Sequence, residues 1–215
     1  MSRCNYDPSN IWKRLAISRF MKLNSNTFFS SDWHLDHANV LSYNNRPFVD
    51  LQAQMDYFRN AILSLPINAT LILLGDIVTS KKNINAILEY VFGTRKDITY
   101  FFVPGNHDKY FTKQFLMYGK VEHYLEAKYG DKKIIMSHYP FAEWDRAHFG
   151  TLHFHGHTHA HFTVEKHGIL AAGKRLDVGW DTANKIFHID EAVSTADSKP
   201  IFNPVHSRNN GLINI

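Results

Sequence analysis

The sequence Leu152-His-Phe-His-Gly-His-Thr-His-Ala-His161 holds five of the fourteen histidines of this 215-residue chain. Side chains of an extended strand alternate between two faces, so we expect the four histidines from His153 to His159 to share one face. Imidazole is a common ligand of zinc, iron, nickel and copper, and Gly156 lets the chain bend close to a bound ion. The stretch alone fits an exposed or adventitiously metal-binding strand equally well. Other segments must therefore supply carboxylates and an amide if a metal centre exists.

The composition excludes several classes of protein. Hydrophobic residues make up 44% and charged residues 20% of the chain, as in an ordinary soluble domain. The formal charge of +4 and the pI of about 9.0 suit an anionic substrate, although we favour a slightly basic surface. Cys4 is the only cysteine, so no internal disulfide can form. No apolar run approaches the roughly 20 residues that span a bilayer, and we expect a cytoplasmic protein without a membrane partner.

Polar clusters follow four predicted strands. The strand at 27–31 leads to Asp32 and His34, and the continuous apolar run at 70–74 leads to Gly75 and Asp76. The next two strands, at 99–103 and 133–136, lead to Asn106-His107-Asp108 and to His138. In open α/β sheets, ligand sites lie at the carboxyl ends of the strands. We therefore expect these side chains to meet at one edge.

The rest of the chain frames this edge. Apolar residues from Leu51 to Leu65 recur at spacings of three and four, which predicts an amphipathic helix, and 81–92 predicts a second. We expect a less regular helical segment at 109–132 and a closing strand at 170–178. Residues 1–26 are predicted to be an extension with a short helix packed on the domain. Residues 27–193 form the predicted domain, and 194–215 a polar, partly irregular tail.

Taken in order, these clusters resemble the calcineurin-like metallophosphoesterase superfamily. Its pattern is Asp-x-His, Gly-Asp, Gly-Asn-His-Asp/Glu, a lone His and Gly-His-x-His, and every part is present between Asp32 and His159. Asn45 to Phe48 and His138 to Pro140 look like a small branch found in bacteria and phages. The resemblance implies an α/β fold, a four-layer α/β/β/α sandwich with a dinuclear metal site at strand ends.

The resemblance also implies a ligand set for two divalent cations. One metal would be held by Asp32, His34, Asp76 and His159, and the other by Asp76, Asn106, His138 and His157. Manganese is our first choice, and iron, zinc and nickel also suit such ligands. A water or hydroxide bridging the metals would attack phosphorus. His107 would face the substrate and assist the leaving oxygen.

Two further residues are candidates for the catalytic set. Asp108 could accept a hydrogen bond from His107 and raise the pKa of the imidazole, or it could be a turn residue. Arg46 could clamp a phosphate, because guanidinium pairs with phosphate through two hydrogen bonds, or it could form a surface ion pair. We expect His37 to be solvated.

The function expected from the sequence is metal-dependent hydrolysis of a phosphomonoester or phosphodiester, with a nucleotide among the candidate substrates. Two alternatives stay open: a nuclease acting on DNA or RNA, and an inactive metal-binding interaction module. The basic pI permits nucleic acid, but no groove of aromatic and basic residues indicates it. The Gly75-Asp76 motif lacks the Asp-Arg-Gly continuation of the protein Ser/Thr phosphatases, which argues against that class. The oligomeric state stays open.

Overall fold

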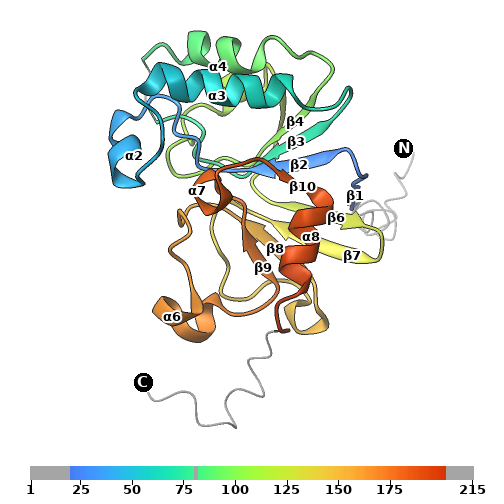
Figure 1. The fold of residues 1–215 in the computed structure, drawn as a ribbon. Helices are drawn as coiled ribbons and strands as arrows, with labels where there is room; N and C mark the ends of the chain where they lie inside the picture. Colours follow the sequence, from blue (N-terminus) through green and yellow to red (C-terminus); the bar gives the residue numbers. More distant parts are fainter. Residues whose placement is uncertain (1–19, 80–81, 202–215) are drawn as a thin grey trace, which may run out of the picture.

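Two five-stranded sheets form the centre of the molecule in the computed structural model, which describes residues 20–79 and 82–201 (Figure 1). The first sheet has the order β10-β2-β3-β4-β5, and all its neighbouring strands are parallel except β10 and β2. Its strands are β10 (Phe187–His188), β2 (Thr27–Ser30), β3 (Thr70–Leu73), β4 (Thr99–Phe102) and β5 (Gly119–Val121). The three predicted strands at 27–31, 70–74 and 99–103 are thus confirmed.

Helices α3 (Leu51–Leu63) and α4 (Ile84–Phe92) cover the outer face of this sheet, at the top of Figure 1. Asp50 caps α3 by accepting a hydrogen bond from the backbone N–H of Ala53. The apolar stripe of α3 packs on the sheet through Phe58, whose ring stacks on Trp33 with centroids 4.3 Å apart. Both helices lie where the sequence periodicity predicted them.

The second sheet has the order β1-β6-β7-β8-β9, and only β6 and β7 are antiparallel. Its strands are β1 (Met21–Lys22), β6 (Leu125–Tyr129), β7 (Lys132–Met136), β8 (Leu152–His155) and β9 (Arg175–Asp177). The prediction of a helical segment at 109–132 is wrong for most of its length. The helix α5 spans only Thr112–Phe115, and β5 and β6 follow it. The Glu-Ala-Lys core of β6 has low strand propensity, and pairing with β1 and β7 overrides that preference.

The two sheets pack face to face around one apolar core. Phe29 of β2 meets Phe154 of β8 edge to face, with ring centroids 5.1 Å apart. Helix α8 (Ile189–Asp197) closes this core at the side of both sheets, and Ala192 and Ala196 are fully buried there. The outer face of the second sheet carries a thin layer made of the loop around Trp144, the turn η1 (Ala147–Phe149) and the short helix α6 (Val164–His167). The predicted α/β/β/α order is therefore confirmed.

Three predicted boundaries need correction. The boundary at 193/194 lies inside α8, because buried Ala196 makes the helix part of the core. Within 1–26, residues 21–22 form strand β1 instead of helix, since they pair in parallel with β6. The predicted closing strand at 170–178 is β9 alone, preceded by the turn η2 (Gly168–Ala171). The remainder of the predicted N-terminal helix, at 1–19, lies outside the described residues, as do residues 202–215 of the tail.

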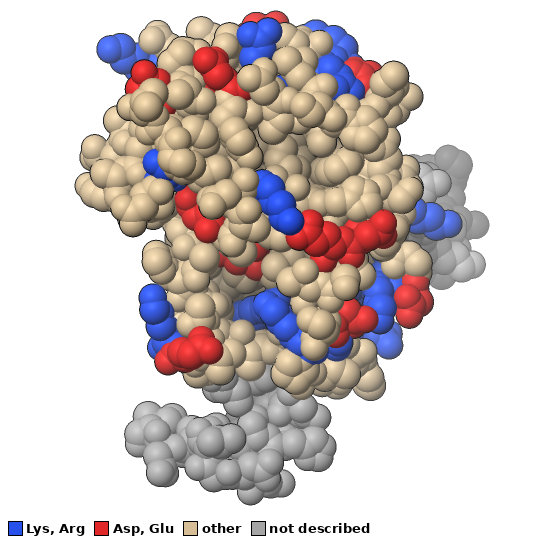
Figure 2. All heavy atoms as spheres, in the orientation of Figure 1, with Lys and Arg blue, Asp and Glu red and all other residues tan. Residues whose placement is uncertain are grey.

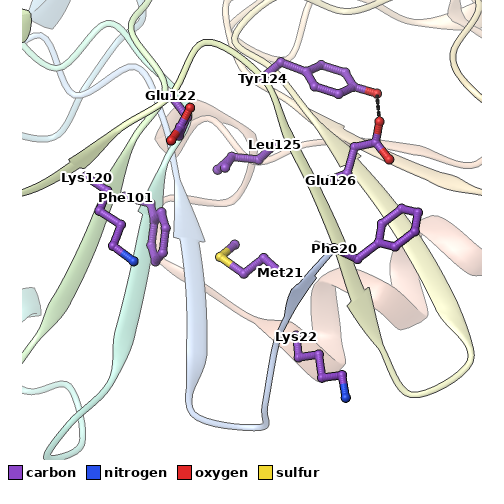
Figure 3. Close-up of a pocket in the computed structure, with 9 residues that line it drawn as sticks. All are labelled: Phe20, Met21, Lys22, Phe101, Lys120, Glu122, Tyr124, Leu125 and Glu126. Carbon is purple, nitrogen blue, oxygen red and sulfur yellow. Dashed lines mark hydrogen bonds between the residues drawn. The ribbon is translucent and has the colours of Figure 1, made fainter. Parts of the chain in front are cut away.

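A groove of about 640 Å³ opens between the two sheets, where β1 and β6 face β4 and β5. Figure 3 shows Met21 and Leu125 in this groove, with Phe101 and Phe20 at its sides. It contains none of the predicted metal ligands. On the face drawn in Figure 2, Lys and Arg side chains are interspersed with Asp and Glu. In the part of the chain that the structure describes, no helix is both long and apolar enough to cross a membrane.

Candidate metal centre

Five of the seven predicted metal ligands have left-handed backbone conformations. Their φ angles are 59° for Asp32, 50° for His34, 54° for Asp76, 72° for His157 and 46° for His159. Such angles are uncommon outside glycine and cost of order 1 kcal/mol or more per residue, so they persist only where surrounding contacts enforce them. Strands β2, β3 and β8 are therefore followed by sharp turns, which direct these side chains toward a common point beyond the sheets.

The predicted alternation of the four histidines on one strand face is wrong beyond His155, because the strand ends there and His157 and His159 have left-handed backbones. Strand β8 ends at His155, and only His153 and His155 share its outer face, where both are buried. The ring of His153 stacks on Phe141, and its Nε2 accepts a hydrogen bond from the backbone N–H of Phe141 at 3.0 Å. His157 and His159 reach the candidate centre through the left-handed turn instead.

Two glycines allow the turns to approach one another. A Cβ atom on Gly156 would lie 1.9 Å from Oγ of Ser31, and one on Gly105 would lie 2.1 Å from Oδ1 of Asp76. Because Gly156 leaves this space, the backbone N–H of His157 donates to both carboxylate oxygens of Asp32, at 3.1 and 2.9 Å. The first and last predicted ligand segments, 125 residues apart, are thereby joined directly.

The ligand atoms form three overlapping groups, in each of which they lie within 4.8 Å of one another. The first group holds Asp32, His34 and His159, and the second holds Asp76, His138 and His157. A third group joins His34 and Asp76 to His107. Asn106 completes the set, with Oδ1 3.1 Å from Nε2 of His138. All seven predicted ligands thus come together at the strand ends.

The donor atoms around His138 fit a cation. Nδ1 of His138 lies 2.8 Å from the carbonyl oxygen of Leu74, which can only accept, so Nδ1 carries a proton. Nε2 then faces two oxygens, Oδ1 of Asn106 at 3.1 Å and Oδ2 of Asp76 at 3.4 Å. Burial opposes a charge on His138, but its hydrogen bond to Asp76 dominates and raises its pKa to about 9. A proton on Nε2 of His138 stabilises the nearby oxygens of Asn106 and Asp76, and a metal ion could occupy the place of that proton.

His34 gives a second sign of a good fit. Its side chain is buried, and among the described residues neither ring nitrogen has a hydrogen-bond partner. Nε2 of His34 lies 3.9 Å from Oδ2 of Asp76, close enough for both atoms to bind one cation. Burial lowers the pKa of His34 to about 3, so the imidazole is neutral and can act as a ligand.

The two carboxylates differ in their electrostatics. Burial raises the pKa of Asp32 to about 7, and the nearby charges of Asp177 and Asp76 act in the same direction. Burial also opposes ionisation of Asp76, but hydrogen bonding from His138 outweighs it and lowers the pKa to about 2. A divalent cation would favour the ionised form of Asp32, so the buried pair of carboxylates suits a cationic ligand.

Asp181, in the helix α7 (Trp180–Ala183), was not among the site residues predicted from the sequence. Oδ2 of Asp181 lies 2.6 Å from Nδ1 of His159 and accepts a hydrogen bond from Asn44, at the end of helix α2 (Ala38–Tyr43), at 3.0 Å. Nδ2 of Asn44 also lies 2.7 Å from Nδ1 of His159, but it donates to Oδ2 of the same carboxylate. The carboxylate can only accept, which assigns a proton to Nδ1 of His159 and leaves Nε2 for an ion. The available signal was the position of Asp181 after the predicted closing strand at 170–178 and a Gly-Trp pair, as other polar clusters follow other strands.

Arg46 is not positioned to clamp a phosphate. Its side chain is buried, and Nε and NH2 donate to the carboxylate of Asp181 at 2.8 and 2.7 Å. NH1 donates to the carbonyl of Trp33 and to the side chain of Gln54, and NH2 also donates to the carbonyl of Asp32. The ion pair is thus buried, and neither of the roles considered for Arg46 from the sequence is correct.

Asp108 does not contact the imidazole of His107 as a hydrogen-bond acceptor. Its fully buried carboxylate accepts hydrogen bonds from the backbone N–H groups of Ile77, Val78 and Gly105, at 3.0 to 3.2 Å. Burial raises its pKa to about 7, although these hydrogen bonds favour the ionised form. The turn interpretation fits: Asp108 ties the turn after β4 to the segment that carries Asp76.

The rim of the centre is open. His107 has a side chain 42% exposed, with Nε2 4.0 Å from Oδ2 of Asp76, while its backbone N–H donates to Oδ1 of the same residue. His37, which we expected to be solvated, is only partly exposed, and its ring centroid lies 6.5 Å from that of His107. Two imidazoles therefore border the space in front of the predicted ligands.

Comparison with known proteins now gives the family. The calcineurin-like phosphoesterase model matches residues 26–171, which contain all seven predicted ligands. The chain belongs to this family. Members of the calcineurin-like phosphoesterase family are hydrolases of phosphoesters that typically bind divalent metals. This supports metal-dependent phosphoester chemistry in general.

The relatives do not define the substrate. An uncharacterised protein of Methanocaldococcus jannaschii is 27% identical over 161 residues, which cover 73% of this chain and 82% of the relative. A protein of unknown function from Aquifex aeolicus superposes with a TM-score of 0.58 at 22% identity, over 75% of this chain and 94% of that one. The nuclease MPE of Pseudomonas putida gives a TM-score of 0.45 at 16% identity, over 63% of this chain and 61% of the nuclease. The similarity to the Aquifex protein shows the shared fold.

Proposed function

We propose that this calcineurin-like phosphoesterase hydrolyses small phosphoesters with two divalent cations held at the strand ends. The observation that carries the proposal is the position of Asp76. It lies in one group of ligand atoms with His34 and in another with His138 and His157. A carboxylate shared between two such groups is suited to bridging two cations.

The ligand groups support a division of the seven residues. Asp32, His34 and His159 would hold one cation, and Asn106, His138 and His157 the other, with Asp76 common to both. Two cations there would neutralise phosphoryl oxygens and lower the pKa of a water that attacks phosphorus. Mixed imidazole, carboxylate and amide ligands fit manganese, and iron, zinc or nickel are the alternatives.

His107 is proposed to act on the substrate. Its imidazole is the most exposed side chain of the third group, and it forms no hydrogen bond with another residue of the described ranges 20–79 and 82–201. From there it could stabilise charge on a phosphoryl oxygen and protonate the leaving oxygen as the P–O bond breaks. The open rim would admit a monoester or a diester, with a nucleotide among the candidates.

The test compares the parent chain with Asp76→Asn on mono-aryl and bis-aryl phosphate esters, with added manganese. We expect turnover of the parent, loss of at least two orders of magnitude in the variant, and less metal bound per chain. Asp131→Asn serves as the control, because its carboxylate is 87% exposed on the surface. Turnover by Asp76→Asn at the parent rate with full metal content would refute the assignment. A parent chain that binds metal but hydrolyses neither ester would favour an interaction module.

A further inference from the structure

A second cavity, of about 530 Å³, lies on the outer side of the second sheet. Its lining is mainly apolar and comes from the loop before α6, from α6, η2 and β9, and from the segment after α8, through Phe162, Val164, Ala171, Leu176 and Pro200. None of the seven predicted metal ligands lines it. In Figure 2 the surface is hollowed between the positions that α6 and α8 occupy in Figure 1, with both basic and acidic side chains at the margin. The size and the apolar lining suit a small organic ligand.

Arg175 of β9 lines this cavity and is only 2% exposed. Its Nε donates to the carbonyl of Ala172 at 2.9 Å, but among the described residues NH1 and NH2 have no hydrogen-bond partner. Its guanidinium lies 4.9 Å from the ring centroid of Trp144 and 5.3 Å from that of Phe162. The rings offset part of the cost of burying the charge. Four N–H groups of a cation nevertheless remain without an acceptor, which is costly unless a ligand supplies one.

The neighbouring groups do not neutralise Arg175. Asp177 also lines the cavity, but its carboxylate accepts from Oγ1 of Thr158 at 2.6 Å and from the backbone N–H groups of Ala160 and Gly179 at 3.0 and 2.7 Å. No carboxylate among residues 20–79 and 82–201 forms an ion pair with Arg175.

Two further groups add donors. Lys199 lines the same cavity, and its Nζ donates to the carbonyl of Arg175 at 2.7 Å. Partial burial, and then the charge of Arg175, lower the pKa of Lys199. Oγ1 of Thr182 is a buried hydroxyl of the lining without a partner among the described residues. The cavity therefore collects two cations and a hydroxyl at an apolar wall. Of the two carboxylates in its lining, Asp177 is held by the hydrogen bonds above and Glu165 is exposed to solvent at the edge.

We propose that this cavity binds a small organic anion, with an apolar body against Phe162 and Leu176 and a single carboxylate or phosphonate-like head group on Arg175. NH1 and NH2 of Arg175 are covered by neighbouring side chains in this structure, so binding requires side chains of the lining to shift. The head group would then supply the acceptors that these nitrogens lack, and guanidinium pairs well with planar or tetrahedral oxyanions. The site is separate from the metal centre and does not depend on the proposed hydrolase activity.

The experiment is calorimetric titration of the full chain with octanoate, with neutral octanamide of the same body, and with acetate as the head group alone. We expect octanoate to bind at least tenfold more tightly than octanamide, and acetate to bind weakly. Arg175→Met should remove the preference for octanoate, and Lys199→Met should reduce it. Arg146→Met is the matched control, because Arg146 also lies over an aromatic ring, that of Phe149, but outside the cavity. Octylphosphonate, whose P–C bond a phosphoesterase does not cleave, tests the other head group.

Several outcomes decide the proposal. The proposal is supported if octanoate or octylphosphonate binds the parent, if Arg175→Met weakens that binding, and if Arg146→Met binds as the parent does. Equal binding of octanoate and octanamide, or no binding of octanoate and octylphosphonate, overturns it, as does octanoate binding that Arg175→Met leaves intact. If Arg175→Met does not fold, two other variants replace it in the test. Arg175→Lys should still bind octanoate, and Lys199→Met should bind it more weakly than the parent. Asp76→Asn should bind octanoate as the parent does, which separates this test from that of the hydrolase.

Discussion

Nδ1 of His159 lies 2.6 Å from Oδ2 of Asp181. The same carboxylate forms an ion pair with buried Arg46. Burial opposes ionisation of Asp181, but His159 and Arg46 outweigh it and lower the pKa to about 2. The carboxylate therefore fixes the tautomer of His159 and the direction of its Nε2.

The first prediction concerns Asp181. Asp181→Asn should lower metal affinity or turnover about 10- to 100-fold, the usual effect of removing the partner of a metal-binding histidine. Metal analysis and aryl phosphate hydrolysis measure the two effects, with Asp131→Asn as the surface control. An unchanged affinity and rate would show that His159 needs no such partner.

The second prediction distinguishes a structural role of Arg46 from substrate binding. Arg46→Met leaves Asp181 buried without its cation, so the free energy of unfolding should fall by about 3–5 kcal/mol. Urea unfolding measures this loss, and Arg146→Met at an exposed site should stay close to the parent. If Arg46→Met kept the parent stability and only raised KM, a direct contact with phosphate would be indicated instead.

The third prediction concerns Asp108. Asp108→Asn replaces a carboxylate that accepts three backbone N–H groups with an amide that can accept through one oxygen only. Hydrogen bonds to charged groups contribute about 1.5–3 kcal/mol each, so we expect a loss of about 2 kcal/mol or more in unfolding free energy. A lower turnover at unchanged stability would point back to a direct action on His107.

The fourth prediction is a pH dependence far from the metal centre. The carboxylate of Asp197 pairs with Lys132 at 2.8 Å and Lys174 at 2.7 Å, and hydrogen bonding to Lys132, then to Lys174, lowers its pKa. A folded-state pKa below the unfolded value of about 3.9 stabilises the fold above that value, and the contribution is lost as the pH falls through the folded pKa.

Asp197→Asn should therefore lower the unfolding free energy at pH 7 by about 0.5 kcal/mol, the scale of a partly exposed pair. The difference from the parent should shrink as the pH drops below about 4. Urea unfolding at pH 7, 4 and 3 measures it. A difference that grows toward acid would contradict the sign of the shift.

Local sequence signals were sufficient for much of the fold. The strands at β2, β3 and β4 follow from apolar and β-branched runs, and α3 follows from its spacing of three and four. Strand β6 could not be predicted in this way, because Glu126, Ala127 and Lys128 become a strand only through pairing with β1 and β7. Non-local pairing leaves no period in a single segment.

The candidate centre shows the same division. The identities and order of its ligands are local motifs, and the structure brings them together. The partners of Arg46 and Asp108 were not predictable from the sequence. Asp181 is 135 residues from Arg46, and most of the backbone N–H groups that donate hydrogen bonds to Asp108 belong to another loop. Burial and partner geometry decide such roles, and neither is encoded in a residue type alone.

By itself, the sequence determined the α/β class, the family and the residues able to ligate metal, since these depend on residue type and spacing along one segment. Tertiary structure alone decided the left-handed turns at Asp32, Asp76 and His157, the buried Arg46–Asp181 pair and the cavity around Arg175. These features exist only because packing holds distant segments against one another and keeps strained backbones and buried charges in place.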